Sequence, residues 1–335
     1  MNILNHYSKR FSRPPGFLTM NPVALEISSN SIRILRLKNN KLGLLPKIYH
    51  EEKFERRINI DNLESDAREK SIVINTLKKI KKIYNLKYVI SALPEDKIYI
   101  YQTEFPRQAL DDVASAVKLN IEENVPLTSK EVNFSYKVSD SDEDKIIVTV
   151  NVVPKKVIEK FTNLIESADL IPFGFLAESE VISKAVVPCD DQGPNLIVRM
   201  NQDNVNILIT KSNIVHYANR IPLNFPDLKL GVESEEFKKL SQELNKTLIY
   251  WFTNKNTTSE NQKIEKAVLV GKLAKTPDLV EYLENSLKID VEIGNNWINC
   301  FSFEDYIPKI KAEEALDMSV VIGLSLYLNR EHSIC

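Results

Sequence analysis

The sequence predicts an α/β fold of two similar lobes with a cleft between them. Each half of the chain opens with short strands joined by tight turns and then alternates helix and strand, the layout of a duplicated unit. No short-period repeat is visible. The chain has 335 residues, of which 43% are hydrophobic, so two domains can each bury a core.

The first lobe is expected over residues 22–94. Apolar runs separated by a polar turn predict a hairpin of two strands. Further on, apolar residues recur on one face of a segment whose lysines fall mostly on the other, which predicts an amphipathic helix. The expected elements are strands over Val23–Ile27 and Ile32–Leu37, a helix over Ala67–Tyr84 and a strand over Tyr88–Ala92.

Residues 95–172 are expected to form a module inserted into the first lobe. Prolines end several of its segments, because proline cannot continue a helix or a strand ladder. Its expected elements are strands over Ile98–Phe105, Val132–Val138 and Ile146–Val153, and helices over Leu110–Asn124 and Lys155–Ala168. The order is strand, helix, strand, strand, helix.

A connection over residues 173–194 is expected to lead to a second lobe over 195–335. The final helix is apolar around its whole axis, so it is expected to be buried and to return toward the first lobe. The expected elements are strands over Asn195–Met200, Val205–Thr210, Ile214–Ile221, Ala267–Val270 and Asp290–Ile293, and helices over Ser234–Phe252, Pro277–Ser286 and Leu316–Leu328.

Composition argues against several classes of protein. The formal net charge is -2, which gives no electrostatic reason to expect a nucleic-acid partner. The cysteines and histidines are scattered, without the close spacing of a zinc site, so no metal is expected. No run of 18 apolar residues is present, so no membrane-spanning helix is expected.

The first 21 residues are expected to be a flexible basic tail. Lys9, Arg10 and Arg13 precede the first acidic residue, Glu26, and several apolar and aromatic residues lie among them. Such a segment is either a disordered tail or a segment that binds a membrane surface or a partner, and the sequence leaves both open.

Three proline-containing motifs follow one another in the middle of the chain: Leu93-Pro94, Phe105-Pro106 and Val125-Pro126-Leu127. They hold the places of turn and helix-end elements in the type IV pilus assembly protein PilM family, which this part of the chain resembles. Near the end, Pro277, Leu279 and Leu283 match a helix start, and Gly323, Leu324 and Leu326 match the closing helix. The resemblance implies a two-lobed actin-like fold, a duplicated ribonuclease H-like unit related to FtsA, with an inserted strand–helix–strand–strand module.

Relatives with this fold bind ATP between the lobes, and the resemblance places the corresponding positions here. The first hairpin has Glu26, Ser28 and Ser29 where the family has an Asp-Gly element, and the second has Arg199 and Asn201. Gly271 and Lys272 stand at the adenosine turn. Glycine allows close backbone approach to phosphate and carboxylates hold the cation, so these replacements describe a degenerate nucleotide site.

The second lobe is also expected to be trimmed. Only Leu223–Val232 stand where the family has an extra subdomain that supplies one wall of the adenine pocket. The missing wall removes stacking area for the base.

Two functions follow from the resemblance. The first is a cytoplasmic scaffold or adaptor, peripheral to the inner membrane, for a type IV pilus-like machine. It would bind the N-terminal tail of a PilN-like membrane protein, in a groove that the resemblance places between the first lobe and the inserted module, and other pilus assembly proteins. It would need no cofactor and no catalytic residue. The second is an actin-like protein of secretion or cell-division machinery that binds ATP, with weak or no hydrolysis.

Overall fold

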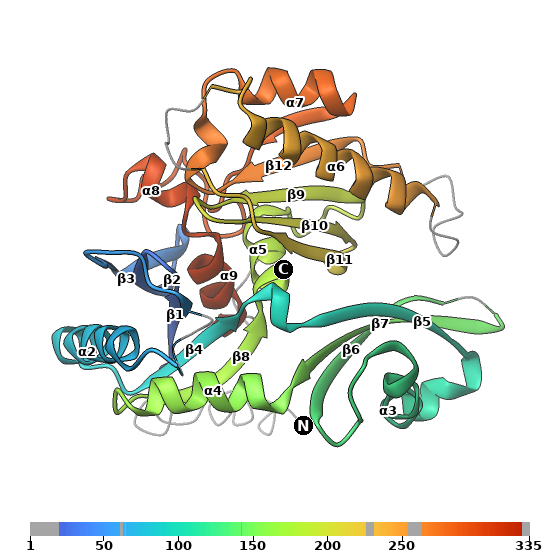
Figure 1. Cartoon of the computed structure of the whole chain (residues 1–335), viewed down its shortest axis with the longest axis horizontal. Coiled ribbons are helices and arrows are strands. Elements are labelled where there is room, and N and C mark those ends of the chain that lie inside the picture. The colour runs from blue at the N-terminus through green and yellow to red at the C-terminus, as the bar shows by residue number, and fades with distance from the viewer. Residues whose placement is uncertain are drawn as a thin grey trace, which may run out of the picture.

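Two five-stranded sheets of the same topology form the two lobes (Figure 1). The computed structural model describes residues 20–60, 63, 65–141, 143–225, 231–253 and 263–329. The expected tail therefore lies outside the described residues except for its last two positions.

The first sheet has the order β3-β2-β1-β4-β8. Its first three strands form an antiparallel meander, and β4 and β8 then add in parallel beside β1. Its strands are β1 (Val23–Ile27), β2 (Ser31–Asn40), β3 (Gly43–Lys53), β4 (Tyr88–Leu93) and β8 (Ile171–Ala177). Of these, β3 and β8 were not predicted.

The second sheet repeats this plan in the order β11-β10-β9-β12-β13. Again three strands form a meander and two more add in parallel beside the first of them. Its strands are β9 (Asn195–Met200), β10 (Val205–Lys211), β11 (Ile214–Ile221), β12 (Lys266–Val270) and β13 (Asp290–Ile293). The predicted duplication is confirmed.

Helices cover the outer face of each sheet. In the first lobe α2 (Ala67–Tyr84) buries Val73, Leu77 and Ile80, and it has the predicted bounds. Asp66 caps its first turn by accepting hydrogen bonds from two backbone N–H groups, which satisfies donors that have no partner inside the helix. In the second lobe α6 (Glu235–Thr253) and α7 (Leu279–Leu287) pack on the sheet in one apolar core.

Two helices cross between the lobes. They are α5 (Glu178–Val186) and α9 (Ser319–Leu328), and both belong to the core that joins the two sheets. The helix predicted over Leu316–Leu328 is buried, but it is interrupted. A short α8 (Ala312–Leu316) ends before Asp317, whose side chain bonds to Arg33, and α9 begins after that turn.

The inserted module has a sheet of its own, with the order β5-β7-β6. Its strands are β5 (Tyr99–Pro106), β6 (Val132–Ser141) and β7 (Lys145–Pro154), and α3 (Val113–Asn124) closes a separate small core on one face. On the other face Gln102 contacts Thr149 and, at 2.5 Å, the Nδ1 atom of His216 on β11. The module therefore touches the second lobe as well as the first.

The expected boundaries over residues 95–194 need correction. The helix α4 (Lys155–Glu166) contributes Leu164 and Ile165 to the first-lobe core, and β8 pairs with β4 in the first-lobe sheet. Residues assigned to the end of the module and to a connection thus build the first lobe and α5. The physical reason is that β8 completes a parallel crossover from β4, which local pattern alone does not reveal.

Within the described part of the chain, no helix combines the length and apolar character needed to cross a bilayer.

Candidate functional site

A cavity of about 440 Å³ lies between the two lobes, where the β1–β2 and β9–β10 turns face each other. Six of the seven residues predicted for the degenerate nucleotide site line it: Glu26, Ser28, Ser29, Arg199, Asn201 and Lys272. The seventh, Gly271, does not line the cavity, and its N–H donates to the carbonyl oxygen of Leu316 at 2.9 Å. The predicted positions are therefore brought together in space.

The β1–β2 turn is closed by its own hydrogen bonds. The backbone N–H of Ser28 donates to the carbonyl oxygen of Ser31 at 3.0 Å, and the Ser28 hydroxyl donates to the same oxygen at 2.9 Å. The hydroxyl of Ser28 thus adds a second hydrogen bond that closes the turn, so the turn does not present free backbone N–H groups to a ligand at this position.

The two turns also touch across the cleft. The hydroxyl of Ser29 donates to the Asp203 carboxylate at 3.0 Å, and Arg57 lies 3.4 Å from the same oxygen. Asp203 belongs to the β9–β10 turn, in which the Asn201 side chain donates to Asn204 Oδ1 at 2.9 Å. The mouth of the cleft is therefore bridged by side chains of both lobes.

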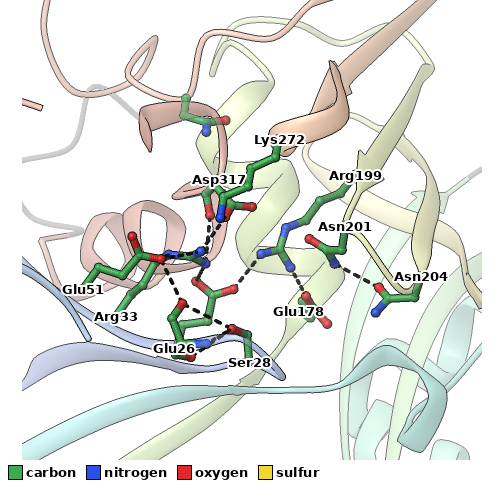
Figure 2. A network of polar contacts seen from close by, with 12 residues as sticks. Glu26, Ser28, Arg33, Glu51, Glu178, Arg199, Asn201, Asn204, Lys272 and Asp317 are labelled. Carbon is green, nitrogen blue, oxygen red and sulfur yellow. Dashed lines mark hydrogen bonds and ion pairs between the residues drawn. The ribbon is translucent and has the colours of Figure 1, made fainter. Parts of the chain in front are cut away.

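Arg199 lies at the centre of the cleft and is fully paired at its terminal nitrogens (Figure 2). Its Nη2 atom lies 2.6 Å from Glu26 Oε1, and its Nη1 atom bonds to Glu178 Oε1. Burial opposes the charge, but the carboxylates of Glu26 and Glu178 outweigh it and keep the pKa of Arg199 above its ordinary value. The guanidinium joins a strand of the second lobe to the first lobe and to α5.

A second buried cation, Arg33 on β2, extends the network. It lies 3.2 Å from Glu26 Oε2 and 2.9 Å from Glu51 Oε1, and it bonds to Asp317 Oδ2. Burial favours a neutral Asp317 carboxyl, but Arg33 is the first of the cations that overcome this effect and lower the pKa of Asp317. Lys272, the most exposed cation of the group, lies 3.6 Å from Asp317.

Sequence reasoning missed four partners in this network: Arg33, Glu51, Glu178 and Asp317. One signal was available, since Arg33 and Arg199 each interrupt an apolar strand, and a charge at such a position needs a buried counter-charge. The partners themselves come from distant parts of the chain, which no local pattern indicates.

The chemistry of this network is that of an ionic lock. Its three cations and four carboxylates form ion pairs with one another, and Glu26 is bonded to an arginine at each oxygen. Among the described residues, no group of three or more His, Cys, Asp or Glu side chains is placed to hold a metal ion. A cation or phosphate that entered the cleft would have to displace these ion pairs, which are partly shielded from water.

The expected trimming of the second lobe is visible in the chain path. β11 ends at Ile221 and α6 begins at Glu235, and part of the short connection, residues 226–230, lies outside the described residues. Too little chain remains there for a further subdomain.

Comparison with known proteins gives similarity at the level of structure alone. No protein-family model and no curated protein matches the sequence. A solved PilM–PilN type IV pilus biogenesis complex contains a chain that matches with a TM-score of 0.72 at 14% identity, covering 92% of this chain and 98% of that chain. This chain has the fold of PilM. The resemblance predicted from the motifs is thus confirmed for the actin-like fold.

Two further structures match less closely. The cytoplasmic domain of EpsL, an inner-membrane component of the type II secretion system of Vibrio cholerae, has a TM-score of 0.49 at 11% identity, covering 91% of this chain and 94% of that one. The ethanolamine utilization protein EutJ from Carboxydothermus hydrogenoformans has a TM-score of 0.48 at 12% identity, covering 94% and 91%.

Proposed function

We propose that this PilM-like chain is a non-catalytic scaffold of a type IV pilus-like inner-membrane machine, cytoplasmic and peripheral to that membrane. The observation that carries the proposal is the pairing of Arg199 with Glu26 and Glu178 inside the cleft where related folds hold ATP. The carboxylate that would organise a hydrated cation is already bound to the chain's own cations. A cleft locked in this way supports a structural role.

The partner we propose is the N-terminal tail of a PilN-like membrane protein, because the structure with the matching fold is a PilM–PilN complex. The region expected to receive it lies between the first lobe and the module. There β8 is the last strand of its sheet, and Phe173 on it is 45% exposed. An extended tail can add to such an edge through backbone hydrogen bonds while its side chains contact exposed apolar groups.

The test uses a fluorescent synthetic peptide with the N-terminal sequence of the single-span membrane protein encoded beside this chain. Fluorescence anisotropy with the full chain is expected to show saturable binding. Phe173→Asp should weaken it about tenfold or more, because it places a charge in an apolar contact. The matched control is Leu119→Asp, since Leu119 is 81% exposed on α3 of the module. The absence of peptide binding by the wild type would refute the proposed partner.

The cavity itself favours one alternative, an ATP-binding protein. It has about 440 Å³ of space, and the hydroxyls of Ser28 and Ser29 and the ammonium of Lys272 line it. Lysine and hydroxyl groups can contact phosphate without a metal. Thermal shift measurements separate the two functions: stabilisation by Mg-ATP, or by ATP with EDTA, would support the alternative, and no shift supports the scaffold.

A further inference from the structure

Three large hydrophobic side chains stand exposed at one edge of the molecule, far from the module. Leu42 is 44% exposed, Phe303 50% and Ile307 79%. We name these three residues the apolar patch. Leu42 lies in the β2–β3 turn of the first lobe, and the other two lie in the segment before α8 (Figure 1). Large exposed apolar side chains that gather in this way mark interaction sites.

Backbone and aromatic contacts bring together the two segments that carry these side chains. The N–H of Leu44 donates to the carbonyl oxygen of Cys300 at 2.8 Å, which fixes the β2–β3 turn against the later segment. The ring of Phe301 then contacts Phe303, with centroids 5.8 Å apart, and Tyr306, with centroids 5.0 Å apart. Phe301 is buried in the inter-lobe core, so the patch is anchored on rigid structure.

The two chain segments that carry the patch have a net positive charge. Residues 38–47 and 302–311 contain five lysines and two acids, a net charge of +3. All five lysines are exposed, and none has an ion-pair partner among the described residues. The lysines are Lys38, Lys41, Lys47, Lys309 and Lys311, and the acids are Glu304 and Asp305. Exposed apolar side chains with exposed lysines in the same segments suit an anionic lipid surface, because the apolar groups can enter the interface while the ammonium groups meet phosphate headgroups.

We propose that this edge of the molecule docks on the surface of an anionic bilayer, through the apolar patch and the lysines around it. The choice of cation favours lipid over a protein partner. Residues 38–47 and 302–311 contain no arginine. Protein interfaces are depleted in lysine and enriched in arginine, whereas the point charge of lysine suits diffuse headgroups. This contact goes beyond the proposed function, because it gives the chain a membrane contact of its own.

Co-sedimentation of the full chain with lipid vesicles tests the proposal. We expect binding to phosphatidylcholine vesicles that contain phosphatidylglycerol, weak binding to phosphatidylcholine alone, and loss of binding at high salt. The double variant Phe303→Ser/Ile307→Ser should lower the partition coefficient about tenfold or more. Lys309→Glu/Lys311→Glu should remove the preference for phosphatidylglycerol. The single variant Ile307→Ser changes the most exposed of the three positions, so it should weaken binding without unfolding the protein. Melting curves of every variant check that each one is folded.

The matched control is Lys118→Glu/Leu119→Ser on α3, which makes the same chemical changes at the opposite end of the molecule (Figure 1). It should bind vesicles as the wild type does. Equal binding to both kinds of vesicle, or unchanged binding in folded patch variants, overturns the proposal. So does light scattering that shows a wild-type dimer which the patch variants dissociate, since the patch would then bind a second copy. Binding of the tail peptide is measured separately and should be the same in all these variants.

Discussion

Gly323 in α9 lies against the carbonyl oxygen of Val181 in α5, so closely that a Cβ atom on Gly323 would fall 1.8 Å from that oxygen. The two helices cross between the lobes, in the core that both sheets share. Glycine is required here because the neighbouring atom is backbone and cannot move aside without shifting a helix.

Gly323→Ala should therefore lower the free energy of unfolding by about 3 kcal/mol, at the upper end of the usual cost of overpacking. Urea unfolding followed by circular dichroism measures the change. Gly174→Ala is the control, because a Cβ atom on Gly174 would meet nothing within 4 Å. It should change stability by no more than about 0.5 kcal/mol. Equal effects of the two substitutions would contradict the close crossing of α5 and α9.

Arg199→Met tests the ionic lock. Removing one member of a buried ion pair leaves its partner uncompensated, and here Glu178 loses Arg199 while Glu26 keeps Arg33. We expect the free energy of unfolding to fall by about 3 kcal/mol. The double variant Arg199→Met/Glu178→Gln should recover part of that loss, because the unpaired carboxylate is removed as well.

The control for the ionic lock is Lys246→Met, which breaks the exposed pair with Glu243 on α6. Its effect should stay below about 1 kcal/mol. An Arg199→Met protein as stable as the wild type would show that the network contributes nothing to the closed cleft.

Much of the fold could be predicted because its signals are local. The hairpin strands are apolar, and α2 combines helical periodicity with a capping aspartate. β3 was missed because it is a half-buried edge strand that carries Pro46 at a register shift and shows no clear alternation. α4 was assigned to the module and β8 was not predicted as a strand, because their partners, α2 and β4, lie about a module's length earlier in the sequence.

The site was predictable only in part, for a similar reason. The resemblance placed Glu26 and Arg199 near each other, and the structure joins them. The remaining partners, Glu178 and Asp317, lie on other elements and reach the cleft only through the packing of α5 and the turn before α9. Which carboxylate meets which arginine is decided by tertiary structure, and periodicity carries no information about it.

Glu95 should make stability depend on pH. Its carboxyl is buried beside the first turn of α5, where it accepts a hydrogen bond from the Ser179 N–H at 2.9 Å. Burial raises the pKa of Glu95 from 4.5 to about 7, and the charges of Glu178 and Glu180 act in the same direction. Because the folded pKa is raised, the contribution of Glu95 to stability is complete below pH ~4.5 and is lost as the pH rises through ~7.

The separation between these two pKa values corresponds to about 3 kcal/mol. Glu95→Gln removes the titrating group, so stability should fall less between pH ~5 and ~8 in this variant than in the wild type. Chemical unfolding at several pH values gives the difference between the two proteins. Parallel pH profiles for wild type and variant would mean that Glu95 does not titrate in this range.

The last prediction concerns ATP. Isothermal calorimetry should detect no binding of Mg-ATP tighter than about 10 micromolar to the wild type. A magnesium ion needs free oxygen ligands, but Glu26 is bonded to Arg33 at one oxygen and to Arg199 at the other. The turns add a second obstacle, because Ser28 and Asn201 occupy positions where only glycine allows phosphate to approach the backbone closely.

The variant Arg199→Asp separates two ways in which this prediction could fail. If the wild type binds ATP without magnesium and Arg199→Asp does not, the arginine is a phosphate ligand and the cleft is an anion site. If Arg199→Asp instead gains binding that requires magnesium, the arginine is what excludes the cation in the wild type, because the substitution restores a carboxylate at that position. Tight Mg-ATP binding by the wild type itself would refute the proposed scaffold function, since the ionic lock would then open at little cost.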